Sequence, residues 1–196
     1  MKNTDRGESD ARERVLAAAE RLFRERGYQV VTLRDIARDL GIRHTSLYHH
    51  FPQGKEALFV EVITRRMQGY RAGLEGAIQA AGADWQDRLR AAALWLLSQP
   101  AMQLGRMLQS DMRVISSQAA KNLRVVVFES LLLPLTAIFQ DALANNPIKH
   151  QRSATLAGMF LSLIEGIDNL PPSYVTGSKE ELVEMTLDLV TNGLQS

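Results

Sequence analysis

Apolar residues recur three and four positions apart along almost the whole chain, which is the spacing of helices that bury one face. The pattern predicts helices over about 9–26, 33–40, 42–50 and 55–81 in the first part of the chain. The apolar stripe of the first of these is formed by Val15, Ala18, Ala19, Leu22 and Phe23. Nowhere do apolar and polar residues alternate as in a strand, so the pattern predicts an all-α protein.

The middle of the chain predicts three more helices. Asp84 can cap a helix that ends before Pro100, and a short helix covers about 101–112. A longer helix covers about 116–145 and contains Pro134. Because proline has no backbone N–H, we expect it to kink this helix.

Helix 55–81 contains three glycines, Gly69, Gly73 and Gly76. Each glycine in a helix interior costs about 1 kcal/mol relative to alanine. Close packing against neighbouring helices is the favoured explanation, and a hinge between the N-terminal region and the rest of the chain is the alternative.

The last two helices, about 152–170 and 178–193, carry the most apolar surface. Ser178 and Glu181 have the spacing of a capping box that starts the second. The first is apolar nearly all round its centre, so it must be covered on both sides. A second copy of the chain is the simplest cover, giving a two-fold four-helix bundle, and a monomer with central helices is the alternative. The predicted homodimer interface consists of Leu156, Met159, Phe160, Leu163, Ile164, Ile167, Leu182, Met185 and Leu189.

Residues 32–51 predict a helix-turn-helix. Thr32 and Asp35 have capping-box spacing, and Gly41 can adopt the positive φ that ends the first helix. The second helix starts with hydrogen-bond donors, and residues 42–54 contain no acidic side chain. A helix start also has free N–H groups and partial positive charge, so this helix suits a DNA major groove. The alternative is a helix pair of the same geometry in a protein that does not bind DNA.

Several short segments share their order and spacing with a known DNA-binding domain. They are Val15–Phe23, Gly27-Tyr28, Thr32 with Ile36-Ala37, Gly41, Ser46–Pro52 and Lys55–Leu58. Through them, residues 12–63 resemble the N-terminal domain of the TetR/AcrR family of transcriptional regulators. The turn from Pro52 to Lys55 is one residue longer than its commonest form in that family.

The resemblance implies a three-helix helix-turn-helix head and a helical ligand-binding and dimerisation body. We place the head at residues 1–53 and the body at residues 54–196, and the polar residues 1–8 predict a disordered arm. The implied partner is a double-stranded DNA operator. The positions that match the family's contacts are Thr32, Tyr48 and Lys55 for phosphates, Arg34, Arg43, His44 and Thr45 for base edges, and His49 for backbone or solvent. For Arg34, a solvated surface charge is an almost equal alternative.

The resemblance also implies a pocket for a small-molecule effector in the body. The candidate lining residues are Trp95, Met102, Met107, Met112 and Phe128, since methionine is adaptable and aromatic rings offer contact area. Residues of these types at helical spacing are more often plain core. Asp111, Arg113 and Glu129 are candidate polar anchors, with surface positions favoured.

Composition narrows the function classes only slightly. The net charge is +1, and residues 1–60 hold 11 Lys/Arg and 9 Asp/Glu, against 12 and 13 in residues 61–196. The absence of cysteine excludes disulfides and thiolate metal sites. The N-terminus lacks the apolar core of a signal peptide, and the apolar core at 154–164 is too short to span a bilayer. We therefore expect a cytoplasmic protein without membrane contact.

Catalytic motifs are missing. The sequence has no phosphate-binding glycine-rich motif, no Gly-x-Ser-x-Gly and no His-Glu-x-x-His. We expect neither an enzyme nor a cofactor or metal. The predicted function is a ligand-responsive repressor, and the alternatives are a helical interaction protein without specific DNA binding and an enzyme whose residues gather only in the fold.

Overall fold

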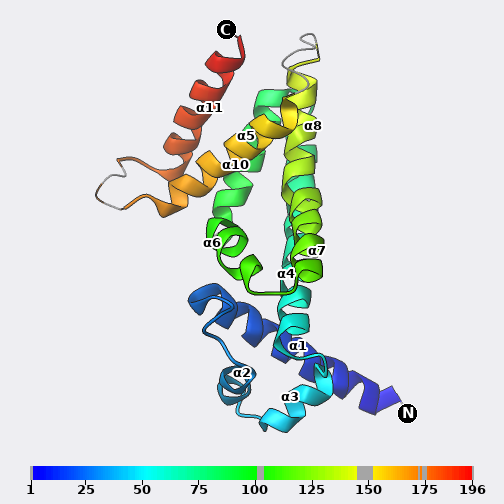
Figure 1. The fold of residues 1–196 in the computed structure, drawn as a ribbon. Helices are drawn as coiled ribbons and strands as arrows, with labels where there is room; N and C mark the ends of the chain where they lie inside the picture. The colour runs from blue at the N-terminus through cyan, green and yellow to red at the C-terminus, as the bar shows by residue number, and fades with distance from the viewer. Residues whose placement is uncertain (1, 101–103, 145–151, 172, 174–175, 196) are drawn as a thin grey trace. The chain divides into compact units, whose positions relative to one another are not determined.

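The computed structural model describes residues 2–100, 104–144, 152–171, 173 and 176–195, and their regular structure is helical throughout (Figure 1). The all-α class predicted from the sequence is confirmed. The elements are α1 (Lys2–Arg26), α2 (Leu33–Asp39), α3 (His44–His50), α4 (Gly54–Ala80), α5 (Trp85–Ser98), α6 (Leu104–Gln109), the 3₁₀ turn η1 (Asp111–Arg113), α7 (Ser117–Val127), the π-helical turn η2 (Phe128–Leu132), α8 (Leu133–Ala142), α10 (Ser153–Asn169) and α11 (Lys179–Gln195).

The helices form two compact units. Unit 1 consists of Met1–Arg66 and Gln103–Arg124, and unit 2 of Met67–Met102 and Val125–Ser196. Helices α4 and α7 contribute residues to both. These units are defined by packing, whereas the predicted head and body are defined by function, so the functional boundary at residue 53 stays a prediction.

Local signals place the helix ends of unit 1 as expected. Gly27 and Gly41 have positive φ of 81° and 65°, directly after α1 and after the cap of α2. Thr32 and Asp35 form the predicted capping box. One difference concerns residues 2–8, expected as a disordered arm, which are the first part of α1. They contain no proline, so a helix that has formed downstream can extend through them.

The predicted long helix around Pro134 is divided into α7, η2 and α8. The N–H of Leu133 donates to the carbonyl of Phe128, five residues back, and Pro134 follows at the start of α8. A π-helical turn of this kind adds one residue to the local hydrogen-bonded ring. The widened turn is how the helix accommodates a proline that cannot donate.

From Ser117 to Ala142 this helix is long and apolar enough to cross a membrane, by length and composition only. The sequence prediction overlooked this stretch and took 154–164 as the longest apolar core. Within unit 2, Leu131, Leu135 and Ile138 of this helix are completely buried. A helix in the core of a folded protein can be equally long and apolar.

The core of unit 2 is built around α5, which packs against α8, α10 and α11. Figure 1 shows α10 crossing α8 and α5. The rings of Phe139 and Phe160 meet edge to face, 6.1 Å apart, between α8 and α10. The Asp84 and Ser178 caps of α5 and α11 are present as the sequence predicts.

The three glycines of α4 differ in their surroundings, which gives a stability prediction. A methyl group at Gly73 would overlap the indole ring of Trp95, whereas nothing lies within 4 Å of one at Gly69 or Gly76. Gly73→Ala should therefore destabilise the protein by about 1–3 kcal/mol through overpacking. Gly69→Ala and Gly76→Ala should each stabilise it by about 0.5–1 kcal/mol, because alanine favours a helix. Urea unfolding of the three variants is the measurement, and equal shifts for all three would contradict the close-packing explanation.

Candidate nucleic-acid interface

A hollow of about 450 Å³ lies in unit 1 where the starts of α2, α3 and α4 come together. Its lining residues are Thr32, Leu33, Arg34, His44, Tyr48, Gly54 and Lys55. Five of the eight predicted DNA contacts are in this set. The fold thus brings together side chains that are up to 23 positions apart in the sequence.

The start of α2 is fixed by reciprocal hydrogen bonds. Thr32 donates from its N–H (2.9 Å) and its hydroxyl (2.6 Å) to the carboxylate of Asp35, whose N–H donates back to the hydroxyl (3.2 Å). The hydroxyl bond from Thr32 is the main reason why the pKa of Asp35 is lowered. Thr32 is exposed and Arg34 follows it on the surface, so the cap holds both side chains at the hollow.

Helix α3 is anchored by one buried side chain and exposes the others. Leu47 is completely buried, while Arg43, Thr45 and Tyr48 are exposed. The N-cap residue Arg43 makes no side-chain capping bond, so its guanidinium is not used to start the helix. The His44 ring meets Tyr48 edge to face at 4.9 Å, which orients both rings at the hollow. His49, the remaining predicted contact on α3, is also exposed.

Lys55 borders the hollow but is bonded to the protein itself. Its ammonium donates to the backbone carbonyls of Tyr28 (2.8 Å) and Val31 (3.0 Å) and lies 4.1 Å from the centre of the Tyr28 ring. Burial lowers the pKa of Lys55. Two of the three lysine donors are thus directed at the loop between α1 and α2. The expected phosphate contact stays a prediction, and the structure adds a role in holding this loop.

A buried carboxylate also binds this loop. Asp111, in η1, is only 5% exposed, and its Oδ1 accepts a hydrogen bond from the N–H of Tyr28 (3.2 Å). Burial raises the pKa of Asp111, against the opposing effects of that bond and of the nearby Arg106 and Lys55. The sequence interpretation favoured the surface for Asp111. The sequence pattern gave no signal of this role, because the backbone group that Asp111 binds lies 83 positions away.

The first turn of α4 also holds the start of α7. The carboxylate of Glu56 accepts hydrogen bonds from the N–H (2.9 Å) and the hydroxyl (2.6 Å) of Ser116. The hydroxyl bond and then the N–H bond lower the pKa of Glu56 below its ordinary value of 4.5. The sequence offered no signal for this contact, which joins residues 60 positions apart.

The Glu56 contact gives a pH prediction. A carboxyl group whose pKa is lower in the folded state contributes stability above its unfolded pKa, and the contribution is lost as the pH falls through the folded value. Glu56→Gln should therefore be less stable than the wild type near pH 7, with the difference shrinking between about pH 5 and pH 3. Urea unfolding across this range is the measurement, with the exposed Glu129→Gln in unit 2 as control. A difference that does not change with pH would contradict the assignment.

Of the five predicted effector-pocket residues, the four that the structure describes are divided between the two units. Met107 and Met112 are buried in unit 1, and Met102 lies outside the described residues. In unit 2, Trp95 packs edge to face against Tyr70 at 5.5 Å, and Phe128 is 43% exposed. Neither Trp95 nor Phe128 lines the more open hollow of unit 2 that is described next.

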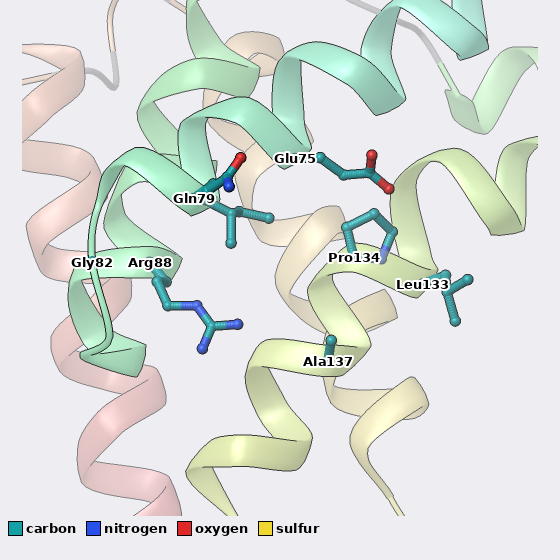
Figure 2. A pocket seen from close by; sticks show the side chains of 8 residues that line it. Glu75, Gln79, Gly82, Arg88, Leu133, Pro134 and Ala137 are labelled. Atoms are coloured by element: carbon teal, nitrogen blue, oxygen red, sulfur yellow. The ribbon is translucent and has the colours of Figure 1, made fainter.

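That hollow, of about 480 Å³, lies between α4, α5 and α8 (Figure 2). It is lined by Glu75, Ile78, Gln79, Gly82, Arg88, Leu133, Pro134 and Ala137. Figure 2 shows Glu75 and Gln79 on α4 opposite Pro134 and Ala137 on α8. Arg88 is the cation of this hollow, and its Nη1 lies 2.7 Å from the carboxylate of Asp141.

The predicted dimer residues fall into two groups. Met159 and Leu163 on α10 and Met185 and Leu189 on α11 are 47–72% exposed, and we call these four the apolar face. Leu156, Ile167 and Leu182 are half-buried.

Phe160 and Ile164, which were also predicted at the interface, lie in the core of unit 2 with 1% and 2% exposure. The prediction for these two is corrected, because the side of α10 that carries Phe160 and Ile164 packs against other helices of the same chain. The sequence prediction missed Val183 and Leu187, four positions apart, which form the buried side of α11.

Comparison with known proteins shows which family this chain is related to. The profile of "Bacterial regulatory proteins, tetR family" matches residues 15–62. The uncharacterized HTH-type transcriptional regulator YxaF of Bacillus subtilis (strain 168) is 30% identical over 174 residues, which cover 83% of this chain and 84% of YxaF. The HTH-type transcriptional repressor KstR2 of Rhodococcus jostii (strain RHA1) is 46% identical over 57 residues, 29% of this chain and 28% of KstR2.

The fold is also found among solved structures. The crystal structure of AibR in complex with isovaleryl coenzyme A and operator DNA aligns with a TM-score of 0.73 over 91% of this chain and 96% of AibR, at 18% identity. This likeness concerns the fold, whereas the match to YxaF extends over most of both sequences. On the strength of that match and of the family profile, the chain belongs to the TetR family of bacterial regulatory proteins.

Proposed function

We propose that this protein is a homodimeric transcriptional repressor that binds a double-stranded DNA operator through α2 and α3 and is released by a small-molecule effector. The observation that carries the proposal is the hollow where Thr32, Arg34, His44 and Tyr48 converge. The relatives in this family are transcriptional regulators, and we assign the chain no enzymatic activity. It would act on DNA in the cytoplasm.

The exposed side chains divide into two groups by chemistry. Thr32 and Tyr48 carry hydroxyl groups at the rim of the hollow. The hydroxyl of Tyr48 suits a phosphate oxygen, whereas that of Thr32 donates to Asp35 and would have to exchange this bond for one to a phosphate. Arg43 and Thr45 are exposed at the start of α3, where side chains of a recognition helix meet base edges. Arginine reads guanine through two parallel hydrogen bonds, so Arg43 is the residue from which we expect most sequence discrimination.

An operator with two half-sites requires two copies of α3, one for each half-site. In two-fold dimers of helix-turn-helix proteins, the recognition helices enter successive major grooves about 34–36 Å apart. The apolar face of α10 and α11 supports such a dimer, because Met159, Leu163, Met185 and Leu189 are too apolar and too exposed to be a favourable free surface. The operator should then be a pseudo-palindrome.

For the effector we propose the hollow of unit 2 as the binding site. It combines an apolar wall from Ile78, Leu133 and Pro134 with the polar groups of Gln79 and Arg88, a mixture typical of small-molecule sites. Release of DNA requires that the effector bind the two states differently, and inverting a 99:1 equilibrium takes about 5.5 kcal/mol of differential affinity. Equal effector affinity for free and operator-bound protein would exclude induction.

The test is a binding titration of the purified protein against the DNA beside its own gene and against duplexes from a random-sequence selection. We expect tight, sequence-specific binding at about physiological salt, with a steep loss of affinity as salt rises, since phosphate contacts release counterions. Weak binding that is equal on all duplexes would instead favour a helical interaction protein of the same fold.

A further inference from the structure

We propose that Asp111 is a positioning residue for DNA reading: together with Lys55 it holds the loop 27–31, and through it the cap of α2, in place. The proposal rests on the proposed function and deepens it. Asp111 lies 61 positions beyond the end of α3, and its described hydrogen bond goes to Tyr28 and not to a predicted DNA contact on α2 or α3.

The loop is bound first by η1 and the residue before it. The Oδ1 of Asp111 accepts the hydrogen bond from the N–H of Tyr28 (3.2 Å), and the hydroxyl of Ser110 accepts one from the side chain of Gln29 (3.3 Å). Tyr28 is buried, so its N–H needs a partner inside the protein. The carboxylate of Asp111 is that partner.

Helix α4 binds the same loop through Lys55. The ammonium accepts no bond but donates to the carbonyls of Tyr28 and Val31. Tyr28 is therefore held by both its N–H and its carbonyl. Val31 directly precedes Thr32, so the position of the α2 cap depends on the same ammonium.

The segment that carries Asp111 is itself tied down at both ends. At its start, Arg106 donates from Nη2 to the carbonyls of Phe23 (3.2 Å) and Arg24 (2.7 Å) at the end of α1. At its end, Ser116 is bonded to Glu56. Residues 104–116 thus belong physically to the unit that carries α2 and α3, although more than 50 residues separate them from α3 in the sequence.

The charge of Asp111 makes the proposal sharply testable. Removing a carboxylate makes the protein more positive, and long-range electrostatics alone predicts tighter binding to DNA. Loss of positioning predicts the opposite, because the cap of α2 would no longer be held in the geometry that fits the duplex. The sign of the change therefore separates the two effects.

The experiment measures binding of the full-length wild type and two variants to a duplex obtained by random-sequence selection with the wild type. Asp111→Ala should bind about tenfold more weakly, as expected for the loss of a hydrogen bond to a charged acceptor. Asp111→Asn should lose less, because its carbonyl oxygen can still accept the bond from Tyr28. Amide hydrogen exchange at Tyr28 should be faster in Asp111→Ala and closer to the wild type in Asp111→Asn.

A variant destabilised elsewhere serves as the control for folding. Phe139→Leu removes packing in the core of unit 2 and should leave operator affinity unchanged at a temperature where all variants are folded. Unchanged or tighter binding by Asp111→Ala, or an equal loss in Phe139→Leu, would overturn the positioning role while leaving the repressor proposal intact. A wild type that selects no duplex would overturn both.

Discussion

Arg43→Ala and Tyr48→Ala should each weaken binding to the operator by about 5-fold to 150-fold, since a good base or charged phosphate contact is worth about 1–3 kcal/mol. Both side chains are exposed on α3, and neither Arg43 nor Tyr48 is needed for its anchoring, which Leu47 provides. The loss should therefore appear in DNA affinity and not in the free energy of unfolding.

The two variants should differ in how the loss depends on sequence. Arg43 is proposed to read a base edge, so Arg43→Ala should relax the preference at one base pair of each half-site. Tyr48 is proposed to contact a phosphate, so Tyr48→Ala should weaken binding by a similar factor on all duplexes.

Titrations against the selected operator and single-base variants of it measure this difference. Lys121→Ala is the matched control, because it removes one exposed positive charge from unit 1 on α7. An equal loss for Lys121→Ala and Arg43→Ala would mean that overall charge, and not α3, determines binding.

The double variant Leu163→Glu, Met185→Glu should convert the dimer into monomers. Each substitution places a carboxylate on the apolar face, and in a two-fold interface each appears twice. An unpaired charge buried in an interface costs several kcal/mol, so dissociation should be favoured by at least about a hundredfold. Because a monomer presents only one α3 to one half-site, operator affinity should fall when the dimer dissociates.

Sedimentation at micromolar protein concentration measures the oligomeric state, and a DNA titration follows on the same samples. Val125→Glu is the control, since Val125 is an exposed apolar residue of unit 2 outside the apolar face. A double variant that remains a dimer would place the interface elsewhere. A monomer that keeps the operator affinity of the wild type would show that the dimer is not needed for DNA binding.

Several features were predictable because they depend on neighbours in the sequence. The caps at Thr32, Asp84 and Ser178 are hydrogen bonds between residues two or three positions apart, so a short motif determines them. The positive φ at Gly27 and Gly41 follows from a glycine at the end of an apolar stripe. From the Thr32 cap and Gly41 we predicted the position of the helix-turn-helix, and with it side chains that line its hollow.

The side on which a helix is buried was decided by packing when the pattern was ambiguous. Helix α10 is apolar nearly all round, so periodicity could not say that Phe160 and Ile164 face their own core while Met159 and Leu163 face outward. The sequence also could not say whether the helix around Pro134 would bend or widen, and the structure shows the π-helical turn η2.

The sequence by itself determined the fold class, most helix ends and the exposed surface of α3, since these follow from local hydrogen bonding and apolar periodicity. Only the tertiary structure decided that Asp111 and Lys55 bind the same loop and that Glu56 binds the start of α7. These contacts join residues 24 to 83 positions apart. A polar side chain in a sequence looks the same whether water or a distant backbone group will satisfy it, and only burial in the folded chain makes the difference.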